Sequence, residues 1–154
     1  MAVPFLDTSA LVKRYVAETG SQWLVSLTDL TARNDCWISS ITPVELLAAL
    51  YLRVRVGSLT LALAQQAEQN FRQELSTHFQ IITLIPVILN RALGLVTAHP
   101  LRAYDAVQLA AALYLESQNT ILGLPSLIMV SADHNLNRAA VAERLAIDNP
   151  NQHP

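Results

Sequence analysis

The chain has 154 residues and a net charge of −2, with 52% apolar and only 14% charged residues. Its length is that of a single domain, no apolar stretch reaches the roughly 18 residues that span a membrane, and the N-terminus lacks the basic start and long apolar run of a signal peptide. The single cysteine, Cys36, excludes an internal disulfide, and we therefore expect a cytoplasmic protein. With so few charged residues, we also expect apolar surface that contacts another protein.

The predicted elements alternate between short apolar runs, which indicate buried strands, and segments with apolar residues at helical spacing. In chain order they are a strand at Val3–Leu6, a helix at Ala10–Val16, a helix from Ser21, a strand at Trp37–Ile41, a helix at Thr42–Val56, an amphipathic helix at Leu59–Phe79, a strand at Ile81–Ile85, helices at Val87–Val96 and Ala103–Leu115, a strand at Leu127–Val130, a helix at His134–Leu145 and an edge strand at Ala146–Asp148. In the helix at 59–79 we expect the apolar face to contain Leu63, Ala67, Phe71 and Leu75.

Strands that are continuous apolar runs and alternate with helices are typical of a parallel sheet covered on both faces. The sequence therefore predicts an α/β fold, a three-layer α/β/α sandwich around a mostly parallel sheet of four to five strands. We expect one domain at residues 1–148 and a short C-terminal tail at residues 149–154.

Four acidic residues fall where strands end or helices begin. Asp7 ends the first strand, Glu45 lies in the first turn after the second, Asp105 opens the Ala-rich helix, and Asp133 follows the fourth strand. In an open parallel sheet, ligands bind beyond the carboxyl ends of the strands. We therefore expect all four carboxylates to gather along one edge of the sheet.

Each of these acids also has a purely structural interpretation. Thr42 and Glu45 have the spacing of a capping box, Asp7 and Asp133 can cap the helices that follow them, and Asp105 can complement a helix N-terminus. Capping alone gives no reason for four carboxylates to converge, because close carboxylates repel unless a cation neutralises them. Oxygen ligands of this kind suit Mg²⁺ or Mn²⁺, so the set favours a divalent-metal site.

Four short motifs together resemble the PIN domain, and most closely the VapC-type toxins of prokaryotic toxin–antitoxin pairs. They are the segments Phe5–Lys13, Ser40–Leu47, Tyr104–Ala111 and Val130–Ala140, and they cover nearly the whole chain in the family's order. The resemblance implies an endoribonuclease that uses Mg²⁺ or Mn²⁺ held by an acidic quartet. By position, the quartet is Asp7, Glu45, Asp105 and Asp133, and the family's hydroxyl residue is Ser9.

The resemblance also implies partners. Proteins of this type are homodimers that act on RNA, and a cognate antitoxin inhibits each by covering the active site with its C-terminal segment. The aliphatic helices at 44–56 and 59–79 would suit both contacts through a groove.

The balance of charged residues is compatible with an RNA substrate. Apart from the quartet, ten cations stand against eight acids, and nine of the ten are arginine, which pairs well with phosphate. Arg102 and Arg138 lie next to the acidic motifs and are the first candidates for phosphate contacts, with Lys13 and Arg14 second. All four can equally be ordinary solvated helix charges.

The proposed chemistry is metal-assisted phosphodiester hydrolysis, with the three aspartates as principal ligands and Glu45 as a ligand or a base that orients water. A haloacid-dehalogenase-like phosphatase would need an Asp where this chain has Ser9. A response-regulator receiver would need a late lysine, but the only lysine is Lys13. The remaining alternative is a catalytically inactive module that acts in protein association or regulation, and the four intact acidic residues argue against it.

Overall fold

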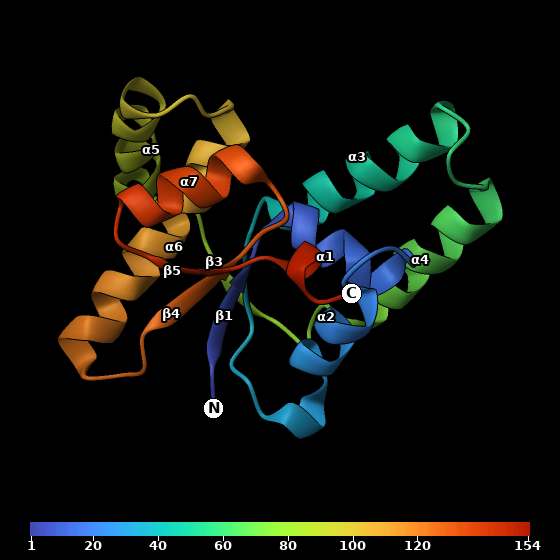
Figure 1. The fold of residues 1–154 in the computed structure, drawn as a ribbon, viewed down its shortest axis with the longest axis horizontal. Helices are drawn as coiled ribbons and strands as arrows, with labels where there is room; N and C mark the ends of the chain where they lie inside the picture. The colour runs from blue at the N-terminus through green and yellow to red at the C-terminus, as the bar shows by residue number, and fades with distance from the viewer.

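A computed structural model describes residues 1–154, and its centre is a parallel sheet of five strands in the order β3-β2-β1-β4-β5 (Figure 1). The strands are β1 (Val3–Leu6), β2 (Trp37–Ser39), β3 (Gln80–Ile82), β4 (Leu127–Val130) and β5 (Ala146–Asp148). The helices are α1 (Thr8–Tyr15), α2 (Ser21–Thr28), α3 (Thr42–Arg55), α4 (Leu61–Glu74), α5 (Pro86–Ala98), α6 (Ala103–Leu122) and α7 (His134–Ala142). None of these helices combines the length and the apolar character that crossing a lipid bilayer would require.

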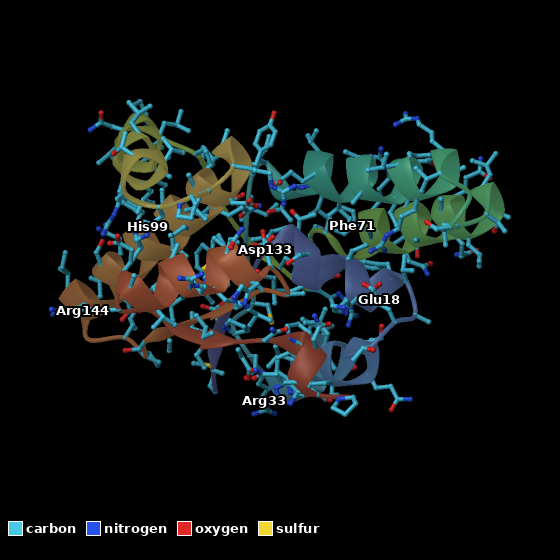
Figure 2. All side chains as sticks on the ribbon, turned by 45° about the horizontal axis from the view of Figure 1, so that its top comes forward. Glu18, Arg33, Phe71, His99, Asp133 and Arg144 are labelled. Carbon is cyan, nitrogen blue, oxygen red and sulfur yellow. The ribbon has the colours of Figure 1, made fainter.

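The two faces of the sheet carry separate apolar cores, because successive side chains of a strand point to opposite faces. In β1, Phe5 packs into a core of 18 buried residues with α5, α6 and α7, whereas Leu6 packs into a core of 14 buried residues with α1 to α4. Side chains fill the space between the sheet and the helices on both sides (Figure 2). The predicted three-layer α/β/α fold is confirmed.

Several boundaries differ from those expected from the sequence. Strand β2 ends at Ser39 instead of Ile41, and β3 runs from Gln80 to Ile82 instead of from Ile81 to Ile85. Helix α7 ends at Ala142 instead of Leu145, because the chain turns away at Arg144, which has a positive φ of 67°.

Helix α6 continues to Leu122, because it ends only where Gly123 adopts a left-handed conformation, with φ of 65°. Helix α4 is shorter than expected and begins at the N-cap Thr60, whose side chain accepts a hydrogen bond from the Leu63 amide. The buried face of α4 contains Ala64, Ala67 and Phe71, and Leu63 lies off this face and is 58% exposed, so its expected place on the buried face was wrong.

The C-terminal segment packs against α2. Residues Pro150–Gln152 form a short 3-10 helix, and the rings of His153 and Trp23 stack with centroids 4.1 Å apart. Gly20, which precedes α2, has φ of 86°, and a Cβ atom there would lie 2.3 Å from the Pro150 carbonyl oxygen. The segment can approach this closely only because residue 20 has no side chain.

Replacing Gly20 with alanine should therefore lower the free energy of unfolding by about 2 kcal/mol. About half comes from the left-handed backbone and the rest from displacing the Pro150 segment and its ring stacking. Gly57→Ala is a matched control, because Gly57 has a similar φ of 80° but open space around its Cβ position. Chemical denaturation should show the larger loss for Gly20→Ala, and equal losses would contradict the packing argument.

Candidate active site

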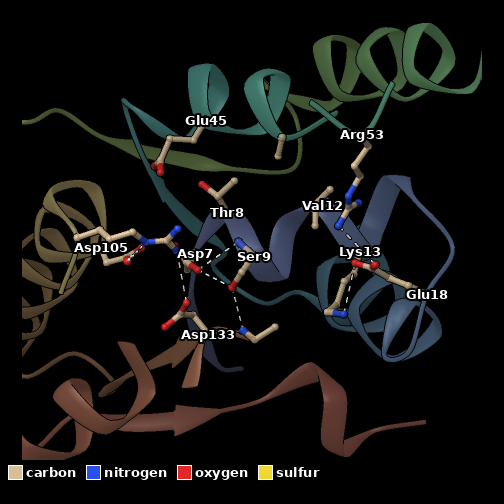
Figure 3. A pocket seen from close by; sticks show the side chains of 13 residues that line it. Asp7, Thr8, Ser9, Val12, Lys13, Glu18, Glu45, Arg53, Asp105 and Asp133 are labelled. Atoms are coloured by element: carbon tan, nitrogen blue, oxygen red, sulfur yellow. Dashed lines mark hydrogen bonds and ion pairs between the residues drawn. The ribbon is translucent and has the colours of Figure 1, made fainter. Parts of the chain in front are cut away.

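A cleft of about 420 Å³ opens beyond the carboxyl ends of β1 and β4 (Figure 3). These neighbouring strands lead to helices on opposite faces of the sheet, which is the position where open α/β sheets bind ligands. The cleft is lined by all four acidic residues that the sequence singled out: Asp7, Glu45, Asp105 and Asp133.

Asp7 lies deepest and is the most constrained of the four. Its backbone amide donates to the Val130 carbonyl of β4 at 3.0 Å, and its side chain caps α1, as predicted, by accepting from the Ser9 amide at 3.1 Å. The hydroxyls of Ser9 and Ser131 donate to the same oxygen, Oδ2, at 2.6 and 3.2 Å. Burial raises the pKa of Asp7 despite the hydrogen bonds from Ser9, and the Asp105 carboxylate raises it further.

The hydroxyls of Ser9 and Ser131 also connect the end of β1 to the loop after β4. Ser9 Oγ accepts from the Ala132 amide at 2.9 Å, and Ser131 Oγ accepts from the Asp133 amide at 3.0 Å. Ser131 is fully buried and was not singled out from the sequence. Asp133 in turn caps α7, as predicted, because its Oδ1 accepts from the Leu136 amide at 2.8 Å.

Glu45 does not take part in a capping box, and that structural interpretation was wrong. Helix α3 already includes Thr42, and the buried Thr42 hydroxyl accepts a hydrogen bond from Gln108 at 3.0 Å instead of capping the helix. Gln108 also donates to Glu45 Oε1 at 2.6 Å. Burial raises the pKa of Glu45; the Gln108 hydrogen bond opposes this rise and the nearby Asp7 adds to it.

Gln108 was missed from the sequence, although a signal was present. It is the one amide side chain in the alanine- and leucine-rich first half of α6, where every neighbour suits the core. It is fully buried and lies one turn beyond Asp105 on the same side of α6, so it sits behind the cleft and contacts Glu45 from there.

Arg102 pairs with two of the carboxylates. Its Nε donates to Asp105 Oδ2 at 3.1 Å, and its Nη2 lies 3.6 Å from Asp133 Oδ2. The hydrogen bond from Arg102 to Asp105, and the charges of Asp133 and Asp7, raise the pKa of the guanidinium. Two carboxylates from different elements thus share one arginine.

The opposite end of the cleft is basic (Figure 3). Lys13 donates to the Thr19 carbonyl at 3.0 Å and lies 3.4 Å from Glu18, whose other oxygen is 3.5 Å from Arg53. Arg53 was missed from the sequence, since it lies twelve residues along α3 and only the fold brings it to the cleft. Its Nη1 is buried and has no hydrogen-bond partner.

The two other cations singled out from the sequence do not line this cleft. Arg14 is held by α4 and α2: its Nε and Nη2 pair with Glu74 at 2.7 and 3.0 Å, and its Nη1 donates to the Thr28 hydroxyl at 2.6 Å. Arg138 is exposed on α7 and lines two separate depressions.

The donor chemistry of the cleft fits a hard divalent cation. The structure gives Asp7 Oδ1 and Asp105 Oδ1 no hydrogen bond from the protein. Gln108 occupies Glu45 Oε1, and the buried Thr8 hydroxyl, which has no well-formed hydrogen bond, lies near enough to Glu45 to lower its pKa. No three acidic, histidine or cysteine side chains are arranged to hold one ion directly. Mg²⁺ retains several waters and binds through one or two carboxylates, so it does not need three direct protein ligands.

The raised pKa of Asp7 determines whether the free energy of unfolding rises or falls with pH. A carboxyl whose pKa is higher in the folded state binds more protons there than in the unfolded chain. Without metal, the free energy of unfolding should therefore fall as pH rises from about 4 through the raised pKa, with no further loss above it. The neutral variant Asp7→Asn should lose less stability over this range.

Chemical denaturation in EDTA across this pH range measures the effect. Mg²⁺ should reduce the difference between the two proteins, because a bound cation offsets the charge of Asp7. Parallel pH profiles in EDTA would contradict the assigned environment of Asp7.

The family model of the PIN domain matches residues 5–142, and the chain therefore belongs to the PIN domain family. No curated protein matches this chain in sequence.

Solved structures with the same fold include proteins of toxin–antitoxin systems. FitAcB from Neisseria gonorrhoeae is 20% identical with a TM-score of 0.64, and the match covers 96% of this chain and 98% of that one. VapBC2 from Rickettsia felis, solved on a DNA fragment from its promoter, is 16% identical with a TM-score of 0.62, covering 96% and 98%. The sarcin-ricin loop cleaving toxin VapC20 from Mycobacterium tuberculosis is 15% identical with a TM-score of 0.58, covering 88% and 94%.

Proposed function

We propose that the chain is a Mg²⁺- or Mn²⁺-dependent endoribonuclease and the toxin of a VapBC-type toxin–antitoxin pair. The observation that supports this most is the meeting of four carboxylates, from four separate segments, in one cleft at the carboxyl end of the sheet. Membership in the PIN domain family supports nuclease chemistry, and a solved protein of the same fold is a toxin that cleaves the sarcin-ricin loop.

In this proposal, Asp7, Asp105 and Asp133 bind the cation directly or through water, and Glu45 completes the set. The cation lowers the pKa of water and balances charge on the phosphate in the transition state. Ser9 and Ser131 fix the Asp7 carboxylate by holding Oδ2, which directs Oδ1 toward the cleft.

Gln108 holds Glu45 in the same way, by donating to one oxygen and leaving the other free. Glu45 then either contacts the cation or orients the attacking water as a base. In the same proposal, Arg102 and the basic end of the cleft, which contains Arg53 and the mostly buried Lys13, would contact the phosphates of an extended RNA strand.

The partner part of the proposal is a cognate antitoxin and a second copy of the chain. Several structural relatives were solved as toxin–antitoxin complexes. Val44 and Leu52 of helix α3 and its C-cap residue Val56 are 64%, 56% and 69% exposed. Together they form apolar surface of the kind that contacts another protein.

Incubation of the purified protein with end-labelled single-stranded RNA tests the activity. Internal cleavage should appear with Mn²⁺ or Mg²⁺ and disappear in EDTA. The alternative of an inactive module in protein association predicts no cleavage and no thermal stabilisation by either metal, and this outcome would exclude the nuclease.

A further inference from the structure

Arg102 is an exposed side chain that nevertheless lies against the acidic end of the cleft. Arg102 is the N-cap residue of α6, and its side chain is 82% exposed, so water surrounds most of this side chain. A long side chain in this position loses rotamer freedom when it holds one geometry, and an isolated exposed ion pair returns little. The attraction of a single exposed carboxylate is therefore too small to hold the guanidinium in one position, and more than one negative charge is needed.

The charges around the cleft supply this additional attraction. Asp105 and Asp133 contact the guanidinium, and Asp7 contributes from behind them. The other two cations of the cleft are already paired with Glu18 at the basic end. Arg102 is thus the only positive side chain that contacts any of the four carboxylates.

The position of Arg102 conflicts with a cation bound directly by the same oxygens. The guanidinium lies between the two carboxylates and contacts Asp105 through Oδ2 and Asp133 through Oδ2. We propose that Arg102 is an intramolecular counter-ion that a divalent cation displaces when it binds. This inference rests on the proposed metal site and adds that the chain's own arginine competes for it.

Exposure makes the displacement easy. Arg102 is 82% exposed, although Asp105 and Asp133 are only 15% and 26% exposed, so the guanidinium can leave both carboxylates directly into water. Its guanidinium has no other hydrogen bond that opposes release. A divalent ion carries twice the charge and is more compact, so it gains more from the same carboxylates. The released guanidinium then stands at the mouth of the cleft, where the RNA phosphate of the proposed reaction would lie.

Removing the arginine should therefore strengthen metal binding while weakening the metal-free protein. In titration calorimetry with Mn²⁺, Arg102→Gln should bind roughly fivefold more tightly than the original protein. In EDTA its Tm should be lower, because the carboxylates lose their counter-ion, and Mn²⁺ should raise the Tm by more than in the original chain. Arg102→Lys should fall between the two, since an ammonium cannot span both carboxylates.

Arg138→Gln is the matched control, because it removes the same charge from an exposed site outside the cleft. It should leave both the Mn²⁺ affinity and the Tm in EDTA near their original values. If Arg102→Gln lowers the Tm but binds Mn²⁺ no more tightly than Arg138→Gln, Arg102 is only structural and the inference is overturned. If neither the original chain nor Arg102→Gln binds Mn²⁺, the proposed metal site itself is overturned.

Discussion

Replacing Asp7 with asparagine should lower the rate of metal-dependent RNA cleavage by about a thousandfold, equivalent to about 4 kcal/mol. Asparagine keeps the shape of the side chain and can accept from Ser9, but it removes the negative charge. Because Asp7 is 3% exposed, this charge is the least screened of the four. Its loss should weaken cation binding more than a change at the cleft mouth.

Single-turnover cleavage of labelled RNA measures this effect, with circular dichroism to show that the variant folds. Asp29→Asn is the control, since Asp29 is an exposed helix-capping aspartate outside the cleft and asparagine caps equally well. Cleavage by Asp7→Asn within a factor of ten of the original rate would remove Asp7 from the proposed metal site.

Replacing Arg14 with methionine should lower the free energy of unfolding by about 3 kcal/mol and leave the cleavage rate of the folded protein unchanged. The two-point pair with Glu74 is mostly enclosed, since the Arg14 side chain is 8% exposed. Tyr15 donates to the same carboxylate at 2.7 Å. Without Arg14, a partly buried carboxylate loses its cation, and such losses cost several kcal/mol.

Arg72→Met provides the comparison on the same helix as Glu74. Arg72 pairs with Glu68, but its side chain is 65% exposed, so its loss should cost less than about 1 kcal/mol. Urea denaturation separates the two variants. A normal free energy of unfolding with weakened RNA cleavage for Arg14→Met would instead support the role in phosphate binding that its sequence position suggested.

Much of the fold follows from the sequence because the strands are short continuous apolar runs. The expected bounds of β1, β4 and β5 agree with the structure. Periodicity was less informative where helices end, since an apolar pattern does not show which turn is the last. Gly123 marks the end of α6 by its backbone conformation, and Thr60 marks the start of α4 by its side-chain cap.

The candidate site likewise contains some residues that the sequence predicts and others that it does not. The acidic residues could be found because strand ends and helix starts are visible in the sequence, and a parallel sheet places them along one edge. The residues that hold them could not be found in this way. Ser131 reaches Asp7 only because β4 pairs with β1. Gln108 reaches Glu45 only because α3 and α6, which cover opposite faces of the sheet, both begin at its carboxyl edge. The Thr42–Glu45 spacing was misleading because a capping box and a buried threonine that bonds another helix have the same sequence pattern.

The most direct test of the metal site is a crystal of the protein soaked in Mn²⁺ and measured at a wavelength where manganese scatters anomalously. The structure predicts one or two anomalous peaks in the cleft, with at least one carboxylate oxygen of Asp7, Asp105 or Asp133 at about 2.2 Å and the remaining ligands mostly water. Arg102 should have moved from Asp105 and Asp133. A crystal with no peak in the cleft, or with manganese bound only elsewhere on the chain, would contradict the proposed metal-dependent nuclease.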